Sequence, residues 1–253
     1  MNSDTPVALC VTCLVDQIMP EVGVAAARLL RRAGCAVDFP QAQTCCGQPF
    51  FNSGLRQEAR RLAQRAITIF EPYEAIVLPS GSCTAMMRLE YPRLLADDPA
   101  WQGRALALAA KTYELSEFLT RQPGWQPIPH PEAPTVTYHD SCHMCRLLHL
   151  HQEPRALLAA AGCSLHEMAE PDRCCGFGGL FSLRLPEVAN ALADEKLRQA
   201  TETGAETLVT ADPGCLMHMR GLSNADSPRL VHLATLLDEL SPEQSRQEAR
   251  LGE

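Results

Sequence analysis

The cysteines of this chain follow one pattern twice. A Cys-Cys-Gly triplet at Cys45–Gly47 recurs at Cys174–Gly176, and a single cysteine, Cys13 or Cys142, stands 32 positions before each pair. A further cysteine closes each pattern, as Ser-Gly-Ser-Cys83 in one half and Asp-Pro-Gly-Cys215 in the other, 37 and 40 positions after the pair. Two chance matches of this length are improbable, so the pattern predicts that the chain is an internal duplication.

A proline-rich segment separates the two halves. Residues 122–134 contain five of the 19 prolines of the chain. Proline fixes φ and removes a backbone donor, which favours a linker over a helix or strand. We therefore predict two similar domains, at 1–121 and 135–253, joined by this linker. The polar residues from Pro242 onward are expected to fray.

Short apolar runs alternate with helical patterns in both halves. The runs are typical of buried parallel strands and lie at Val7–Val11, Ala75–Pro79, Val136–His139 and Thr207–Ala211. Between them, apolar residues recur at helical steps in Pro20–Ala33, Leu55–Phe70, Arg155–Ala161 and Pro186–Thr203. This alternation predicts an α/β fold, with two similar Rossmann-like domains built on mainly parallel sheets. The apolar segments Thr112–Leu119 and Val231–Leu240 are expected to close the two halves.

Several cysteines fall at or just after the predicted strand ends. These are Cys10 and Cys13, Cys83, Cys142 and Cys215. In open α/β sheets, ligands bind beyond the carboxyl ends of the strands. Cysteines that are distant in the sequence are therefore expected to converge on one edge of each sheet.

Composition excludes several classes of protein. Acidic residues outnumber basic ones by 30 to 22, and the net charge of −8 argues against nucleic acid as the main partner and against a polybasic membrane-binding segment. Twelve cysteines in 253 residues fall short of the density of a secreted disulfide scaffold. The sequence shows no secretory signal and no apolar stretch long enough to span a bilayer. We therefore expect a cytoplasmic protein with reduced thiols, whose cysteines serve metal or redox chemistry.

Three kinds of site can use many cysteines. Disulfides fit poorly, because a bond between adjacent cysteines is strained and a cytosolic disulfide rarely persists. A structural zinc site usually shows two Cys-x-x-Cys knuckles, whereas Cys10–Cys13 and Cys142–Cys145 are single knuckles. An iron–sulfur cluster offers several irons to neighbouring thiolates, and glycines let backbone amides approach its anionic centre. The pattern favours an iron–sulfur cluster.

The duplicated pattern resembles the cysteine-rich CCG domain. That domain occurs in the B subunit of heterodisulfide reductase, in the iron–sulfur subunit of glycolate oxidase and in the LutA/YkgE family of lactate utilisation. The Cys10-Val-Thr-Cys13-Leu-Val-Asp-Gln opening, the Ser-Gly-Ser-Cys83 segment and the Pro-Gly-Cys215-Leu-Met-His segment are most similar to the LutA/YkgE family. The resemblance covers nearly the whole chain.

The resemblance implies two ligand sets for [4Fe-4S] clusters, with one or two clusters per chain. The N-terminal set is Cys13, Cys45, Cys46 and Cys83, and the C-terminal set is Cys142, Cys174, Cys175 and Cys215. The longer family pattern ends each domain in Cys-x-x-Cys, but here Met86 and His218 replace the final cysteine. The noncubane clusters of heterodisulfide reductase use that fifth thiolate. Cys10 and Cys145 each lie three positions from a repeat cysteine, and can either supply a fifth thiolate or pack as small hydrophobic residues.

Four polar residues near the cysteines have two possible roles each. His139 and Asp140 can tune a cluster by hydrogen bonds or relay protons, or they can simply end a strand and cap a turn. His218 can contact a sulfide or lie on the first turn of a helix. Arg146 can offset the charge of a cluster or form a surface salt bridge.

The resemblance also implies a function. It suggests an iron–sulfur electron-transfer subunit of a multi-protein system that oxidises L-lactate to pyruvate, with partner iron–sulfur and accessory subunits. The sequence lacks the motifs of hydrolases and nucleotide-binding proteins, and a protein that only holds clusters is typically an electron relay. Two alternatives remain: a heterodisulfide reductase-like thiol–disulfide reductase subunit and a zinc-stabilised assembly module without redox chemistry.

Overall fold

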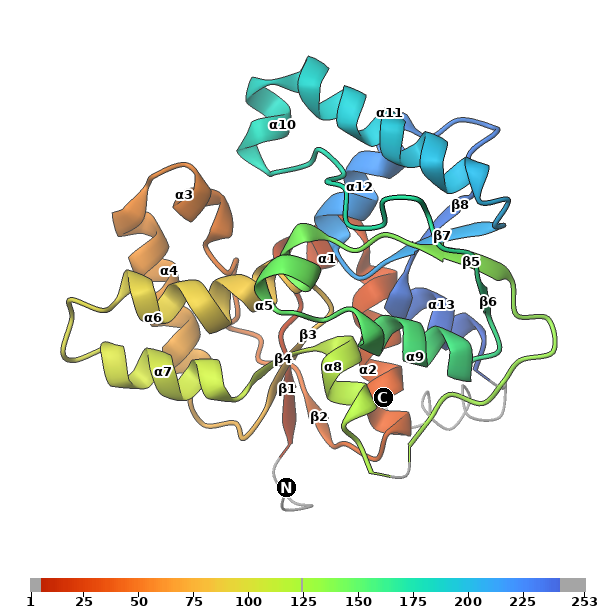
Figure 1. Ribbon diagram of the computed structural model, residues 1–253. Helices are drawn as coiled ribbons and strands as arrows, with labels where there is room; N and C mark the ends of the chain where they lie inside the picture. The colour runs from red at the N-terminus through yellow and green to blue at the C-terminus, as the bar shows by residue number, and fades with distance from the viewer. Residues whose placement is uncertain (1–5, 124, 242–253) are drawn as a thin grey trace.

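Two parallel β-sheets form the framework of the computed structural model, which describes residues 6–123 and 125–241 (Figure 1). The strand order is β2-β1-β3-β4 in the first sheet and β6-β5-β7-β8 in the second, so both sheets have the same topology. Every strand pair is parallel. The strands are β1 (Val7–Leu9), β2 (Val37–Asp38), β3 (Ile76–Leu78), β4 (Thr112–Glu114), β5 (Thr135–Tyr138), β6 (Ser164–Leu165), β7 (Thr207–Thr210) and β8 (Arg229–His232).

The four predicted strands are the central strands of the two sheets. Every residue of β1, β3 and β7 is buried, and cover on both faces explains their continuous apolar runs. The four edge strands are absent from the prediction. β2 and β6 have only two residues each, while β4 begins and β8 overlaps the segments that were expected to close the two halves. The prediction of an α/β fold with two similar parallel sheets is confirmed.

The four predicted helices are also present. α2 and α11 begin with proline at their first position, where the missing N–H would have no helical partner. The helices are α1 (Cys13–Ile18), α2 (Pro20–Arg32), α3 (Gln48–Asn52), α4 (Arg56–Phe70), α5 (Gly81–Ala85), α6 (Tyr91–Leu94), α7 (Gln102–Ala110), α8 (Leu115–Thr120), α9 (Gln152–Ala160), α10 (Leu180–Arg184), α11 (Pro186–Glu202), α12 (Pro213–Leu222) and α13 (Leu233–Glu239), with π-helical turns η1 (Met86–Glu90) and η2 (His143–Leu147).

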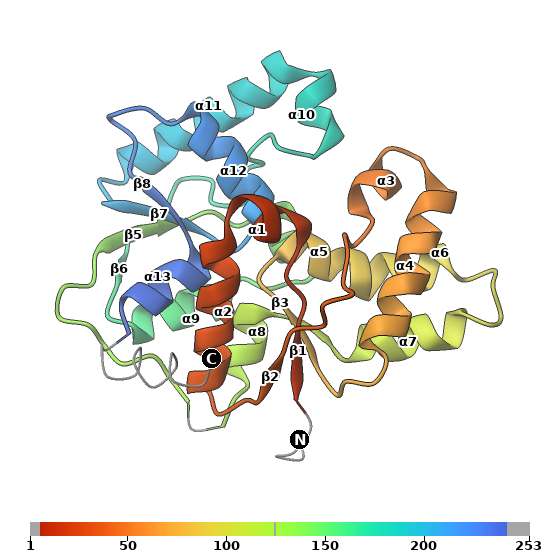
Figure 2. The same cartoon turned by 180° about the vertical axis from the view of Figure 1, so that it is seen from behind.

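Four helices lie between the two sheets and join the halves. α2 of the first half packs against α13 of the second, and α9 of the second half packs against α8 of the first (Figures 1 and 2). α2 and α9 come after the first strand of their own sheets, whereas α8 and α13 come after the last. The two contacts are therefore reciprocal, as in an interface between like subunits.

The buried face of α2 shows how the sequence produces this interface. Its buried residues recur at helical steps and form one apolar stripe: Val22, Ala25, Ala26, Leu29 and Leu30. They belong to a hydrophobic core that includes residues from both halves. At the margin of this core, Asp238 of α13 pairs with Arg28, with 3.2 Å between Oδ2 and Nη1, and also with Arg32. A second core lies between the first sheet and α4, α6 and α7.

The proline-rich segment 122–134 connects α8 of the first half to β5 of the second. The described residues of the 122–134 segment form neither helix nor strand, and the domain boundaries at 1–121 and 135–253 stay a prediction. The expected fraying from Pro242 concerns residues outside the described part. Across 6–123 and 125–241, no helix has both the length and the apolar character needed to cross a membrane.

Candidate metal centre

The eight cysteines of the two predicted ligand sets all follow strands of the two sheets, four after central strands and four after edge strands. Cys13 begins α1 after β1, and Cys83 lies in α5 after β3. Cys142 follows β5 and Cys215 lies in α12 after β7, while the two Cys-Cys pairs lie in the loops that precede α3 and α10. The structure therefore gathers the cysteines where the strand pattern predicted. All twelve cysteines of the chain are free thiols.

The N-terminal set forms two close sulfur pairs. The Sγ atoms of Cys13 and Cys45 are 3.7 Å apart, and those of Cys46 and Cys83 are 3.2 Å apart. Both separations are far longer than the roughly 2 Å of a disulfide bond. Cys46 and Cys83 are buried, whereas Cys13 and Cys45 are half-buried.

The C-terminal set repeats this arrangement. Cys174 contacts the thiols of Cys142 and Cys175, and Cys175 also contacts Cys215. Cys175 and Cys215 are buried, whereas Cys142 and Cys174 are half-buried, as in the first set. The two sets therefore match in both contacts and burial.

One thiol in each set is favoured as a thiolate. The thiol of Cys13 and the backbone N–H of Gly47, 3.4 Å from the Cys45 sulfur, lower the pKa of Cys45. Contacts with Cys142 and the N–H of Gly176 lower the pKa of Cys174 in the same way.

A second thiol of each set resists ionisation. Hydrogen bonding to Cys45 and Cys83, together with burial, raises the pKa of Cys46, and equivalent contacts raise the pKa of Cys175. Four thiols in contact can lose their protons together only when a cation offsets their charge. The donor set therefore fits a metal centre, because thiolates are ligands that zinc and iron–sulfur clusters share.

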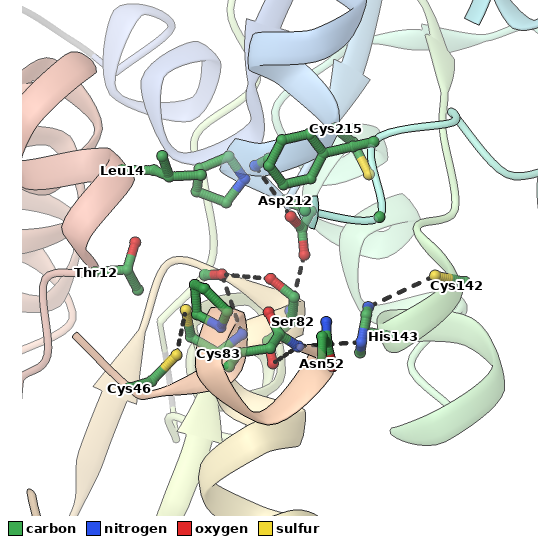
Figure 3. Close-up of a pocket in the computed structure, with 18 of the residues that line it drawn as sticks. Thr12, Leu14, Cys46, Asn52, Ser82, Cys83, Cys142, His143, Asp212 and Cys215 are labelled. Atoms are coloured by element: carbon green, nitrogen blue, oxygen red, sulfur yellow. Dashed lines mark hydrogen bonds between the residues drawn. The ribbon is translucent and has the colours of Figure 1, made fainter. Parts of the chain in front are cut away.

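Both sets open into one cavity of about 170 Å³ (Figure 3). Cys46 and Cys83 line it from the first half, and Cys142 and Cys215 line it from the second (Figure 3). Leu14, Pro49, Phe177 and Pro213 give the cavity apolar walls. Cys45 lies outside this lining and borders a neighbouring hollow that also contacts Cys13. The two cysteine sets thus face a shared, largely apolar space between the halves.

Asp212 ties the two sets together through its carboxylate. Its Oδ2 accepts a hydrogen bond of 2.8 Å from the backbone N–H of Ser82, next to Cys83 of the N-terminal set. Its Oδ1 accepts a hydrogen bond of 3.1 Å from the N–H of Gly214, next to Cys215. Asp212 also caps α12, so one buried carboxylate positions the cysteine-bearing helices of both halves.

His143 and Gln48 make a second link between the halves. The amide of Gln48 donates to the carbonyl of Ser82 and lies 3.1 Å from Nε2 of His143. Because an amide nitrogen only donates, Nε2 of His143 is the acceptor and its proton lies on Nδ1. Nδ1 is 3.5 Å from Sγ of Cys142, so the imidazole N–H faces a cysteine of the C-terminal set.

Replacement of Asp212 by alanine is expected to destabilise the fold by about 2 kcal/mol, because it leaves the buried N–H of Gly214 and the half-buried N–H of Ser82 without their acceptor. The free energy of unfolding from denaturant titration measures this loss. Asp226→Ala, at an exposed carboxylate, is the matched control and is expected to change stability by less than about 0.5 kcal/mol. Equal stability of the two variants would contradict the role assigned to Asp212.

The structure separates the two candidates for a fifth thiolate. Cys10 is buried, and the charges of Cys83 and Cys45 help to raise its pKa, so Cys10 lies beside the N-terminal set. Cys145 instead directs its thiol toward the carbonyl of Asp140, 3.9 Å away. Burial and the charge of Asp140 raise the pKa of Cys145. Cys10 therefore lies beside the N-terminal set, whereas the thiol of Cys145 is turned to a backbone carbonyl.

The other polar candidates are placed as follows. Asp140 forms a two-pronged ion pair with Arg155, at 3.0 and 2.9 Å. Arg146 is exposed and pairs with Asp172. It therefore forms a surface salt bridge, which is one of the two roles considered for it. His218 lies in α12 and its Nε2 is 3.2 Å from the carbonyl oxygen of Ala189.

Sequence reasoning missed Asp212, Ser82, Gln48 and His143 as parts of the centre. Asp212 carries a readable signal, because Asp followed by Pro is typical of a helix N-cap and first position. The contacts of Ser82, Gln48 and His143 cross between the halves. Such contacts have no local signal, because they depend on how the two sheets pack.

The sequence profile of the cysteine-rich CCG domain family matches this chain twice, at residues 7–88 and 136–220. The chain belongs to the CCG cysteine-rich family. It is similar to lactate utilization protein A of Bacillus subtilis, with 45% identity over 235 residues that cover 92% of this chain and 98% of that protein. It is also similar to lactate utilization protein A of Halalkalibacterium halodurans, with 44% identity over 245 residues, 96% of this chain and 99% of that protein.

These comparisons confirm the resemblance drawn from the cysteine pattern. Both segments matched by the CCG family include the complete cysteine set of their half. A hypothetical protein from Helicobacter pylori shares the fold, with a TM-score of 0.70 at 10% identity. The superposition covers 98% of this CCG chain and 51% of that structure, so this chain spans about half of the solved protein.

Proposed function

We propose that this chain is a cytoplasmic iron–sulfur electron-transfer subunit of a multi-protein system that oxidises L-lactate to pyruvate. One [4Fe-4S] cluster would bind to each cysteine set. Its relatives named lactate utilization protein A support the link to lactate. Its partners would be a second iron–sulfur subunit and an accessory subunit of the same system.

The observation that carries this proposal is the convergence of both cysteine sets on one cavity. Each set brings four sulfurs together from three separate segments and gives one of them a glycine N–H donor. Iron–sulfur clusters are typically bound by cysteine thiolates whose sulfurs accept hydrogen bonds from backbone N–H groups. Two such centres facing one space suit the passage of electrons between them.

The residues of the chain would have distinct roles. A bound cluster would accept and release single electrons. The eight cysteine sulfurs would hold the two clusters, and the amides of Gly47 and Gly176 would stabilise the negative charge. Leu14 and Phe177 would limit the access of water to the cavity, because their side chains line it. Asp212 would keep the two sets at a constant separation, since it bonds to both halves.

Metal analysis of anaerobically purified chain tests this proposal. About four irons and four acid-labile sulfides are expected per set, with a broad visible absorption that bleaches on reduction. Stoichiometric zinc without iron would refute the proposal and favour the zinc-stabilised module. An EPR signal that appears only with a thiol substrate would instead favour the thiol–disulfide reductase alternative.

The lactate assignment has its own test. Combined with its partner subunits, the chain is expected to restore L-lactate-dependent reduction of an artificial acceptor, with pyruvate as the product. Omission of this chain is expected to abolish acceptor reduction. Undiminished reduction without it would contradict a role in electron transfer from lactate.

A further inference from the structure

His139 is a buried side chain without a partner. It follows β5, its exposed fraction is 0%, and neither ring nitrogen forms a hydrogen bond among the described residues. The carbonyl of Pro171 lies near the ring, but this contact does not have the geometry of a hydrogen bond. A buried imidazole without partners is costly, so this position calls for a group that the protein itself does not provide.

The ring of His139 reaches the C-terminal cysteine set. A ring nitrogen and the Sγ atoms of Cys175 and Cys215 all lie within 4.8 Å of one another, and all three residues are buried. Three donors at this separation can bind a common metal centre. An imidazole nitrogen with a lone pair is a common metal ligand, which makes His139 chemically suited to join the two thiolates.

The internal duplication identifies the counterpart of His139. The backbone N–H of His139 donates to the carbonyl of Val209 at 2.8 Å, and the N–H of Cys10 donates to Val77 at 2.9 Å. Val209 stands six positions before Cys215, just as Val77 stands six positions before Cys83. His139 and Cys10 therefore occupy the same place in the two halves.

The two halves thus carry different donors at one equivalent position. In the N-terminal half this donor is the thiol of Cys10, which lies beside the cysteine set. In the C-terminal half it is an imidazole. His218, which replaces the last cysteine of the family pattern, is turned to the carbonyl of Ala189.

We propose that His139 is a fifth donor of the C-terminal set and binds its cluster through a ring nitrogen, an inference that rests on the proposed iron–sulfur function. The neutral imidazole replaces the negative thiolate that Cys10 can supply in the other half. Replacement of thiolate by imidazole raises the reduction potential of a cluster. The two centres of one chain therefore differ in potential, with the C-terminal one more readily reduced.

Pulsed EPR of the reduced cluster tests the proposal directly. Full-length chain with the substitution Cys45→Ser, which is expected to empty the N-terminal set, isolates the C-terminal signal. A strong coupling to nitrogen is expected, and its frequencies should change when histidine is labelled with ¹⁵N. His139→Ala is expected to abolish this coupling. His218→Ala, at a histidine on the same side of the fold, is the matched control and is expected to keep it.

A second variant keeps the test decisive if His139→Ala loses its metal. His139→Cys is expected to retain iron and sulfide, to lack the nitrogen coupling and to lower the reduction potential of the cluster. Absence of the coupling in a chain that contains iron and sulfide, or its persistence in His139→Ala, would overturn the inference. Absence of iron and sulfide from the unsubstituted chain would overturn the proposed function instead.

Discussion

Replacement of Cys45 by serine is expected to remove the iron of the N-terminal set, about half of the total when both sets are filled. Cys174→Ser is expected to do the same for the C-terminal set. These two sulfurs are the ones that neighbouring thiols and glycine amides favour as thiolates. A serine hydroxyl is a poor replacement, because soft thiolates are the preferred ligands of iron–sulfur clusters. Iron and acid-labile sulfide per chain measure the loss, and the double variant is expected to retain neither.

Cys35→Ser provides the matched control for these variants. Cys35 is half-buried and packs against the hydrophobic core, away from either ligand set. Its substitution is expected to leave iron and sulfide unchanged. Full iron retention in both Cys45→Ser and Cys174→Ser would show that the two sets are wrongly assigned.

Gly176→Ala is expected to cost about 4 kcal/mol of stability, the sum of backbone strain and overpacking, and to empty the C-terminal set. Gly176 has a φ of +84°, and a Cβ there would lie 2.1 Å from the carbonyl oxygen of Ala189 in α11. This contact involves backbone, so no side-chain rotation relieves it. The loop must shift, and with it the amide that bonds to Cys174. Thermal unfolding and iron content report the two effects.

Substitutions at two other glycines separate the cost of backbone strain from the cost of overpacking. Gly204 has a φ of +68° with nothing near its added Cβ, so Gly204→Ala measures the strain of positive φ alone, about 1 kcal/mol. Gly47 is the repeat counterpart of Gly176, but its Cβ would approach the Leu62 Cβ at 3.3 Å. The stability cost of Gly47→Ala is therefore expected to lie between those of Gly204→Ala and Gly176→Ala. A cost at Gly176 no larger than at Gly204 would refute the steric argument.

The central strands and the positions of the cysteines could be predicted because their signals are local. β1 and β3 are buried on both faces, so their sequences are continuously apolar. The edge strands carry no such signal, since β2 is short and partly polar and β4 is continued directly by α8. Because the same cysteine spacing occurs in both halves, the sequence alone was sufficient to assign eight cysteines to two sets of four.

The shared cavity could not be predicted in the same way. It exists because α2 packs against α13 and α8 against α9, contacts between segments that are far apart in the sequence. Cys10 and Cys145 each lie three positions from a repeat cysteine, yet Cys10 lies beside the N-terminal set whereas the thiol of Cys145 is turned to the carbonyl of Asp140. Cys10 lies at a strand end, three positions before Cys13. Cys145 lies in η2, three positions after Cys142.

The reciprocal packing of the four inner helices has a consequence for how such a protein can change. A symmetric dimer of identical units carries every substitution twice, so its two centres must stay alike. Here the like surfaces belong to one chain, and each half can vary alone. Cys10 and His139 show such a difference at one equivalent position. Joining the halves in a single polypeptide therefore keeps the geometry of a symmetric pair and frees its two cysteine sets to become unequal.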